Sequence, residues 1–411
     1  MKRQFDADFF AGNRKSLLRE LRSGALIVLT AYSQMQRGHD YGYRLEQEPN
    51  FWYLTGITHP DWQVIIDGAS NQSWLVSPDM DPMRELFDGA LTAEQASEIS
   101  GIKHVIDHVE AKQLLAKLRR EHTIVQTLAP QVIPPYYGFI ANPAQRNLMK
   151  DLSEFQVQDC RKELSKLRAI KQPEELEAMQ AAIDITVAGI KTALKSLRSM
   201  KHEYEFEAVL NSEFRRTGGS GHGFDPIIAS GLNACTVHYL ENNAAWSKDD
   251  WLLVDVGAKV SAYSADISRT FPLSSKPSKR SVAVYEAALR VHDRTIELCQ
   301  PGQNVQEYLS SVEDFMTEEL LGLKIINDKS EMRKYFPYSV SHGLGLDVHD
   351  SLAAPLEFRE GMVLTVEPGI QLPDERLSVR IEDDILITAD GPKVMSGKLP
   401  TKLADLEKLI G

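Results

Sequence analysis

Two aspartates lie inside an otherwise apolar strand pattern, and this feature limits how the chain can fold. The segment WLLVDVGAKVSAYSADISRTF contains Asp255 and Asp266. A buried carboxylate is unfavourable unless it is paired or bound to a cation. If the segment forms a hairpin centred between Val260 and Ser261, the two aspartates face each other with Cβ atoms roughly 4.5–5.5 Å apart. A divalent ion would then relieve their repulsion; the alternative is one turn-capping and one solvated aspartate.

Two later segments place more carboxylates in or at the end of strand patterns. GMVLTVEPGI ends an apolar run at Glu367, directly before a Pro-Gly breaker. In SVRIEDDILIT, alternation predicts that Arg380, Glu382 and Asp384 share one strand face. Arg380 would then orient a ligating carboxylate, although an Arg380–Glu382 salt bridge is the simpler alternative.

The segment SHGLGLDVHD adds two imidazoles, His342 and His349, beside Gly343 and Gly345. Glycines let a backbone approach a ligand closely, whereas a single histidine is more often a structural residue. Four carboxylates and one imidazole form a set of mainly oxygen ligands. That set suits a pair of manganese-like or other hard to borderline divalent ions better than structural zinc.

The length of 411 residues favours two domains. In the first part, strands expected at 24–32, 62–68, 73–77 and 122–128 alternate with helices at 13–22 and 93–99, the latter with a capping box of Thr92 and Gln95. This pattern predicts a small α/β domain. The charged, poorly periodic run 161–172 is expected to be a connector, so we divide the chain into domains 1–162 and 163–411.

The second part mixes long helices with hairpin-like strands, which predicts an α+β domain. Its clearest helix begins at Pro173, a residue suited to the first helical turn, and carries one apolar stripe. Helices are expected at 173–197, 202–217, 278–299 and 304–321, and strands at 225–230, 251–258, 263–271, 362–367 and 380–388.

Composition excludes several classes of function. The net charge is −12 and no dense Lys/Arg stripe is present, so nucleic acid is not an expected partner. Three dispersed cysteines do not form a disulfide framework or a Cys-x-x-Cys zinc site. No run reaches the roughly 18 apolar residues that span a membrane, and the N-terminus lacks a secretory pattern, so a cytoplasmic protein is expected.

The segments DVGAKVSAYSADISRTF, SHGLGLDVHD, TVEPG and RIEDD, in this order, resemble those of the pita-bread-fold metallopeptidases, in the Xaa-Pro aminopeptidase (aminopeptidase P) and prolidase branch. EPNFWYLTGITHPD resembles the N-terminal domain of aminopeptidase P. The resemblance implies a C-terminal pita-bread catalytic domain, an N-terminal creatinase-like α/β domain and five metal ligands. These ligands are Asp255, Asp266, His342, Glu367 and Glu382.

The same resemblance implies a function and further site residues. It assigns substrate-side and catalytic roles to His238, in SGLNACTVHY, and to His349. The expected activity is removal of the first residue from peptides with proline in second position, by metal-activated water with Glu367 as general base. Two divalent ions are expected, Mn²⁺ in preference to Co²⁺ or Zn²⁺, in a homo-oligomer, either a dimer or a tetramer.

Three alternatives remain at this point: a prolidase that cleaves Xaa-Pro dipeptides, a metal-free creatinase-like hydrolase, and a catalytically inactive peptide-binding module. The complete ligand set argues against the last two. One departure concerns substrate recognition: many relatives carry a histidine four positions before the metal histidine, where this chain has Tyr338.

Overall fold

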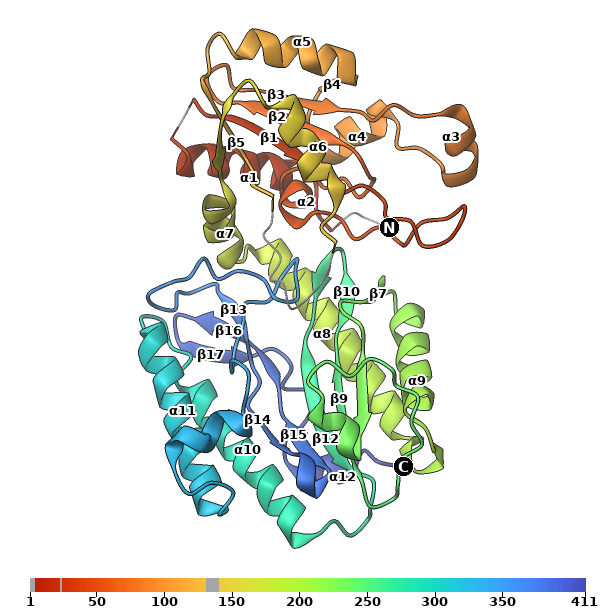
Figure 1. The fold of residues 1–411 in the computed structure, drawn as a ribbon, viewed down its shortest axis with the longest axis vertical. Helices are drawn as coiled ribbons and strands as arrows, with labels where there is room; N and C mark the ends of the chain where they lie inside the picture. Colours follow the sequence, from red (N-terminus) through yellow and green to blue (C-terminus); the bar gives the residue numbers. More distant parts are fainter. Residues whose placement is uncertain (1–3, 23, 131–139) are drawn as a thin grey trace. The chain divides into compact units, whose positions relative to one another are not determined.

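The computed structural model describes residues 4–22, 24–130 and 140–411 (Figure 1). The chain divides into two compact units, Met1–Leu167 and Arg168–Gly411. Helix α7 (Arg161–Ala169) spans the point where one unit follows the other in sequence. The connector expected over 161–172 is therefore largely helical. Its charges lie on a short helix, and the division between the two units, after Leu167, falls within this run.

The first unit is a six-stranded sheet covered by helices. Its strands are β1 (Leu26–Thr30), β2 (Gln63–Asp67), β3 (Gln72–Val76), β4 (His104–Ile106), β5 (Ile124–Thr127) and β6 (Gln156–Asp159). Its helices are α1 (Ala7–Glu20), α2 (Pro49–Thr55), α3 (Pro82–Asp88), α4 (Ala93–Ser100), α5 (His108–Leu118) and α6 (Pro143–Asp151). The strand order is β4-β3-β2-β1-β5-β6, in which β1, β2 and β3 are antiparallel neighbours and the outer pairings are parallel.

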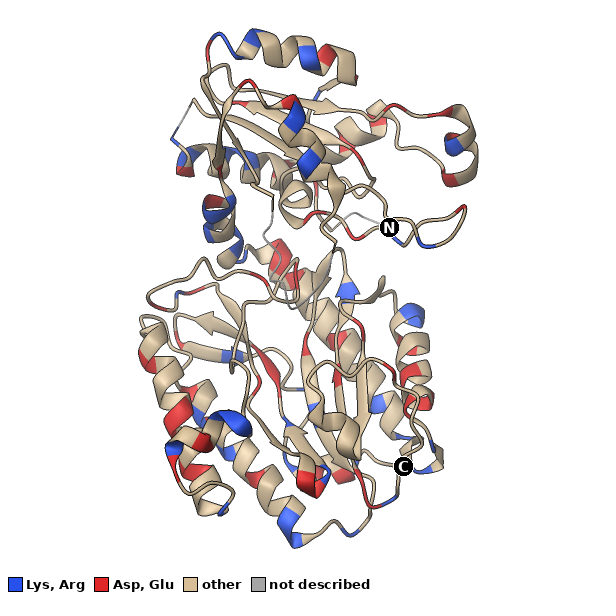
Figure 2. Ribbon diagram, in the orientation of Figure 1, with Lys and Arg blue, Asp and Glu red and all other residues tan. Residues whose placement is uncertain are grey.

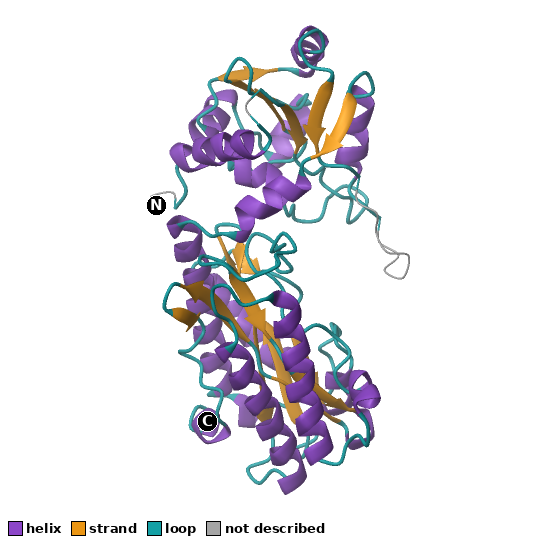
Figure 3. Cartoon of the chain, turned by 90° about the vertical axis from the view of Figure 1, so that its left-hand side faces the viewer, coloured by secondary structure: helices purple, strands orange, loops and turns teal. Residues whose placement is uncertain are grey.

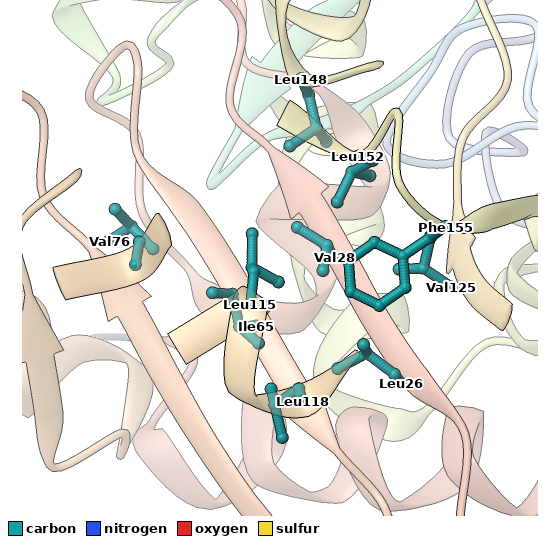
Figure 4. Packing of buried hydrophobic residues seen from close by; sticks show 11 residues of the cluster. Leu26, Val28, Ile65, Val76, Leu115, Leu118, Val125, Leu148, Leu152 and Phe155 are labelled. Atoms are coloured by element: carbon teal, nitrogen blue, oxygen red, sulfur yellow. The ribbon is translucent and has the colours of Figure 1, made fainter. Parts of the chain in front are cut away.

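The core of this unit lies where α5 and α6 pack on the sheet. Leu115 of α5 and Leu148 of α6 lie over Val28 and Ile65 of the central strands (Figure 4). Burial of such side chains contributes about 1.5–3 kcal/mol each. All four strands that we expected are present, and the capping box at Thr92 is confirmed.

The second unit contains two helix pairs, each packed against its own strands. Its helices are α8 (Pro173–Leu194), α9 (Glu203–Arg216), α10 (Lys279–Glu297), α11 (Val305–Gly322) and α12 (Leu403–Glu407). Helices α8 and α9 pack together and against the first strands of the unit, whereas α10 and α11 pack together and α10 contacts the later strands. Figure 3 shows helices lying over these strands. Pro173 begins α8 as expected, at the first helical position.

The strands of the second unit form four small sheets. They are β7 (Gly221–His222), β8 (Ile227–Ser230), β9 (Trp251–Val256), β10 (Ala258–Val260), β11 (Tyr263–Ser264), β12 (Ile267–Pro272), β13 (Val363–Val366), β14 (Gly369–Leu372), β15 (Leu377–Arg380), β16 (Asp383–Thr388) and β17 (Gly391–Val394). The sheet orders are β11-β10-β7, β12-β9-β8, β13-β16-β17 and β14-β15. The α+β class is confirmed. Among the described residues, no helix is long and apolar enough to cross a membrane.

Candidate metal centre

The hairpin that carries the two aspartates differs in register from the sequence-based expectation. Val260 pairs with Tyr263, so the turn consists of Ser261 and Ala262. Both turn residues have positive φ, 47° and 75°. Positive φ at both central residues is the turn geometry that matches the twist of paired strands. The turn lies one residue later than predicted, and Ser-Ala is not a usual sequence for it.

Asp255 therefore pairs with Ser268 and not with Asp266, and the expectation that the two aspartates face each other directly was wrong. Changing the partner by two residues leaves the side chains on their original face, since side chains alternate with period two. The aspartates still interact: burial, followed by the charge of Asp255, raises the pKa of Asp266 well above its usual range.

A close crossing lies beside the aspartates. A Cβ atom on Gly257 would come within 1.7 Å of the carbonyl oxygen of Ala265. Because a Cβ atom is essentially never found so close to a backbone oxygen to which it is not bonded, only glycine fits there without moving a strand. The interruption between β9 and β10 falls at this residue.

His342 lies among the carboxylates. Its Nε2 atom is 3.5 Å from Oδ2 of Asp266 and 3.4 Å from Oε1 of Glu367. The ligand atoms of Asp266, His342 and Glu382 all lie within 4.8 Å of one another. Nδ1 of His342 lies 2.9 Å from the carbonyl oxygen of Gly343. A proton on Nδ1 would leave Nε2 free to bind a cation.

Glu367 follows β13 at the strand end, as the Pro-Gly breaker predicted. Burial raises the pKa of Glu367 to about 7, against the opposing effects of His342 and Arg380. A carboxyl group with a pKa near neutrality can accept and release a proton at physiological pH.

Glu382 does not lie within a strand, and the prediction of one strand over 380–388 was wrong. The chain leaves β15 at Arg380 and enters β16 at Asp383, passing from one sheet to another. The backbone N–H of Glu382 donates to the carbonyl of Ser268 (3.0 Å), and its Oε2 accepts from the Ser268 hydroxyl (2.7 Å). Burial and the charge of Asp266 raise the pKa of Glu382 well above its usual value.

Arg380 lies directly behind the carboxylates. Its Nη2 is 2.5 Å from Oδ2 of Asp255, and its Nε donates to the hydroxyl of Ser268 (3.1 Å). Its guanidinium carbon lies 5.8 Å from the ring centre of Tyr338. Although burial lowers the pKa of Arg380, the charge of Asp255 raises it overall. The guanidinium group of Arg380 therefore holds one carboxylate oxygen of Asp255 in place.

Asp384 is a fifth carboxylate of the centre, which the sequence-based ligand set did not include. It is fully buried, and Oδ2 accepts from the backbone N–H of Asp266 (3.3 Å). Burial raises the pKa of Asp384 well above its usual value. The alternation Arg380–Glu382–Asp384 was the available signal, but its repeated acids gave no reason to prefer one over another.

The donor set fits a divalent cation. Within the described part of the chain, Oδ1 of Asp255 and Oδ1 of Asp384 are buried without a hydrogen-bond partner. Buried polar atoms are nearly always paired, so two orphaned carboxylate oxygens indicate an ion-binding site. Figure 2 shows acidic residues among the strands of this unit as well as on its outer helices. Oxygen-rich sets with one imidazole suit hard to borderline ions.

Two exposed histidines lie beside this cluster. The rings of His349 and His342 are 4.3 Å apart between centroids, at an interplanar angle of 63°. Partial burial, then the neighbouring imidazoles of His342 and His238, lower the pKa of His349 to about 4. His349 is therefore neutral at physiological pH. The structure brings the five expected metal ligands into one neighbourhood with the other four site residues predicted from the sequence, His238, His349, Arg380 and Tyr338.

The loop that carries His342 and His349 is held by a β-bridge between its own residues and by ion pairs with residues that precede α8. Gly343 and Asp350 form an isolated β-bridge, with Asp350 N–H donating to Gly343 O (2.8 Å). The buried Asp350 carboxylate contacts Arg168 Nη2 at 2.9 Å and Lys171 Nζ at 3.6 Å. These cations precede α8 and were not recognised in the sequence, because their partners lie about 180 residues away.

Sequence comparison defines the class of protein. Residues 177–389, more than half of the chain, match metallopeptidase family M24, and residues 10–125 match the aminopeptidase P N-terminal domain. The chain belongs to metallopeptidase family M24 and is a metallo-aminopeptidase by this kinship.

Individual relatives narrow the group further. The chain is 29% identical to the Xaa-Pro aminopeptidase of Haemophilus influenzae, over 98% of this chain and 96% of that protein. It is 30% identical to Xaa-Pro aminopeptidase 3 of Mus musculus, over 93% and 80%. The structure of Escherichia coli aminopeptidase P with the inhibitor Pro-Leu superposes with a TM-score of 0.87 at 28% identity, covering 99% of this chain and 98% of that one. The expected two-domain aminopeptidase P fold is confirmed.

Proposed function

We propose that this chain is an Xaa-Pro aminopeptidase with a dinuclear metal centre, which removes the first residue from peptides with proline in second position. The observation that carries this proposal is the gathering of Asp255, Asp266, His342, Glu367 and Glu382 in a chain that matches an Xaa-Pro aminopeptidase over nearly the full length of both. We further propose domains 1–162, an aminopeptidase P-like N-terminal domain, and 163–411, the catalytic domain.

These five residues would hold the two ions, which supply Lewis-acid activation of the attacking water and of the peptide carbonyl. Glu367, which lies beside His342 in this centre, would accept a proton from that water and then deliver it to the leaving proline nitrogen. Arg380 keeps Asp255 oriented through its 2.5 Å contact. Neutral His349 and exposed His238 donate hydrogen bonds to the substrate carbonyl or position the peptide.

Proline selectivity has a simple physical basis. The amide before proline has no N–H, so the site must recognise the ring by shape and not through that donor. Tyr338 occupies the place where many relatives have a histidine, and it packs beside Arg380. We propose that it supports Arg380 and forms part of the wall of the substrate site.

The proposal is tested with two substrates, an Xaa-Pro-Yaa tripeptide and an Xaa-Pro dipeptide, in the presence of Mn²⁺. Release of the first residue from the tripeptide is the expected result. Cleavage of the dipeptide alone would make the protein a prolidase, which its relatives support less. Failure to cleave either peptide, together with failure to bind metal, would contradict the enzymatic function.

Three further proposals concern the metal ion, the oligomeric state and the cellular compartment of the protein. We propose Mn²⁺ as the working ion, with Co²⁺ and Zn²⁺ as alternatives, because the set has more oxygen than nitrogen ligands. Reconstituting chelated protein with each ion and comparing kcat/KM tests the choice. We also propose a cytoplasmic homo-oligomer, a dimer or tetramer, which light scattering and cell fractionation would check.

A further inference from the structure

A buried carboxylate outside the metal centre gathers the loop that bears His238. Glu203 is the first residue of α9 and has no exposed surface. Its two oxygens accept five hydrogen bonds, all from one segment, 230–244. The donors are Ser230 N (2.8 Å), Ser230 Oγ (2.7 Å), Asn233 Nδ2 (3.1 Å), Tyr239 Oη (2.7 Å) and Ala244 N (3.0 Å).

The positions of the donors matter. Ser230 and Ala244 are the ends of the segment, so one side chain fixes both ends. The hydroxyl of Tyr239, the residue directly after His238, reaches the same carboxylate. Tyr239 is buried, whereas His238, at the end of the turn directly before it, is exposed. Anchoring Tyr239 therefore fixes the backbone next to His238.

The five donors around Glu203 suit a side chain that only accepts hydrogen bonds. All five donors are neutral, and hydrogen bonds to an ionised acceptor are shorter and stronger than neutral ones. The N-terminus of a helix also stabilises negative charge, and Glu203 occupies that end of the 14-residue helix α9. A neutral amide at this position would present an NH₂ group to donors and could not satisfy them all.

We infer that Glu203 is a positioning residue for the proposed reaction: by holding Ser230, Tyr239 and Ala244 at once, it fixes where His238 stands beside His349. This inference rests on the proposed substrate-side role of His238. Glu203 does not touch the metal ligands, and its effect on turnover passes through the His238 loop. If Glu203 only stabilised the fold, the effect of its substitution on turnover would not depend on the presence of His238.

A double-mutant cycle separates these two roles. Glu203→Gln is made in the wild-type chain and in a His238→Ala chain, and kcat/KM is measured on an Xaa-Pro-Yaa tripeptide at saturating Mn²⁺. We expect Glu203→Gln to lower kcat/KM by about 10–100-fold in the wild-type chain, the range for residues that orient a site residue. In the His238→Ala chain the additional loss should be less than about 3-fold. Equal losses in both backgrounds would overturn the inference.

The same helix provides a matched control. Glu213 is also largely buried on α9, but it pairs with Arg216 and, among the described residues, makes no hydrogen bond or ion pair with residues 230–244. Glu213→Gln should leave kcat/KM unchanged. If Glu203→Gln does not fold, Tyr239→Phe removes a single donor and should give a smaller loss that also vanishes in the His238→Ala background; a loss that persists there would overturn the inference.

Hydrogen exchange distinguishes failure of this inference from failure of the proposed function. The amides of Ser230 and Ala244 donate to Glu203, so their exchange should quicken in Glu203→Gln but not in Glu213→Gln. This readout needs no turnover. A wild-type protein without peptidase activity would contradict the proposed function alone, whereas unchanged exchange at both amides would overturn the anchoring by Glu203.

Discussion

Two adjacent residues of β16, Asp383 and Asp384, are both buried aspartates, yet their surroundings differ completely. Asp383 lies 2.8 Å from Arg269 Nη2 and 3.1 Å from His292 Nε2. Although burial alone would raise it, these partners lower the pKa of Asp383 to about 2. Asp384 faces the other side of the strand, among carboxylates, and its pKa is raised.

The difference shows how this unit handles buried charge. On one face of β16 the chain supplies its own counter-charge, and Asp383 is part of the fold. On the other face Asp384 joins Asp255, Asp266, Glu367 and Glu382, whose mutual repulsion Arg380 and His342 offset only in part. Burying a charge without a partner is unfavourable. The second face therefore depends on a cation from solution, and four predictions test this contrast.

The largest effect should come from the face that needs the cation. Glu367→Ala removes the proposed proton acceptor and should lower kcat on an Xaa-Pro-Yaa peptide by about 10³-fold. The midpoint of thermal unfolding in the metal-free protein should not fall, because one repelling carboxylate is lost. Full residual activity would refute the role of Glu367.

The next effect concerns stability on the opposite face. Asp383→Asn leaves the fully buried Arg269 with less counter-charge and should lower the free energy of unfolding by about 3–5 kcal/mol in urea titrations. Asp384→Asn is the matched control in metal-free protein. It should change stability by no more than about 1 kcal/mol or increase it. Comparable losses in both variants would remove the distinction between the two faces.

The pH dependence of stability should reveal the same contrast. The folded pKa of Glu367 is raised from 4.5 to about 7. Metal-free protein should therefore be most stable below pH about 4.5 with respect to this group, and lose on the order of 1–3 kcal/mol as the pH rises to 7. The lowered pKa of Asp383 acts oppositely, since its contribution is lost only as the pH falls toward 2. Urea unfolding with chelator at pH 5 and pH 7.5 measures this, and added Mn²⁺ should reverse the trend.

The smallest effect should come from the second partner of Asp383. His292→Gln keeps a hydrogen-bond donor near Asp383 but removes the imidazole, whose pKa burial lowers and its contacts with Asp293 and Asp383 raise overall. With Arg269 still in place, we expect a loss of about 1 kcal/mol in the free energy of unfolding. A loss as large as that of Asp383→Asn would mean that His292, and not Arg269, is the main counter-charge.

Local patterns in the sequence predicted most of the elements and the neighbourhood of the site. Proline at the first helical position gave the start of α8, and Thr92 with Gln95 gave that of α4, because capping depends on residues a few positions apart. Alternation put Asp255 and Asp266 on one face, and a two-residue error in register preserved that result.

Features that depend on distant contacts could not be predicted from local patterns. RIEDDILIT alternates like one strand, but the chain changes sheets at Glu382. There the backbone N–H of Glu382 donates a hydrogen bond to the carbonyl oxygen of Ser268. Asp384 differs from Asp383 only in what lies across from it. The role that we infer for Glu203 depends on donors 27 to 41 residues away. No pattern around these residues identifies their partners.

The crossing at Gly257 limits how this protein can vary. An added Cβ there would overlap the Ala265 backbone, whereas a Cβ at Gly12 of α1 would have no atom of the described residues within 4 Å. In a mutational scan, alanine should be tolerated at position 12 and every substitution at position 257 should be depleted. Position 257 would then tolerate no substitution, although glycine has no side chain that could bind a ligand or react.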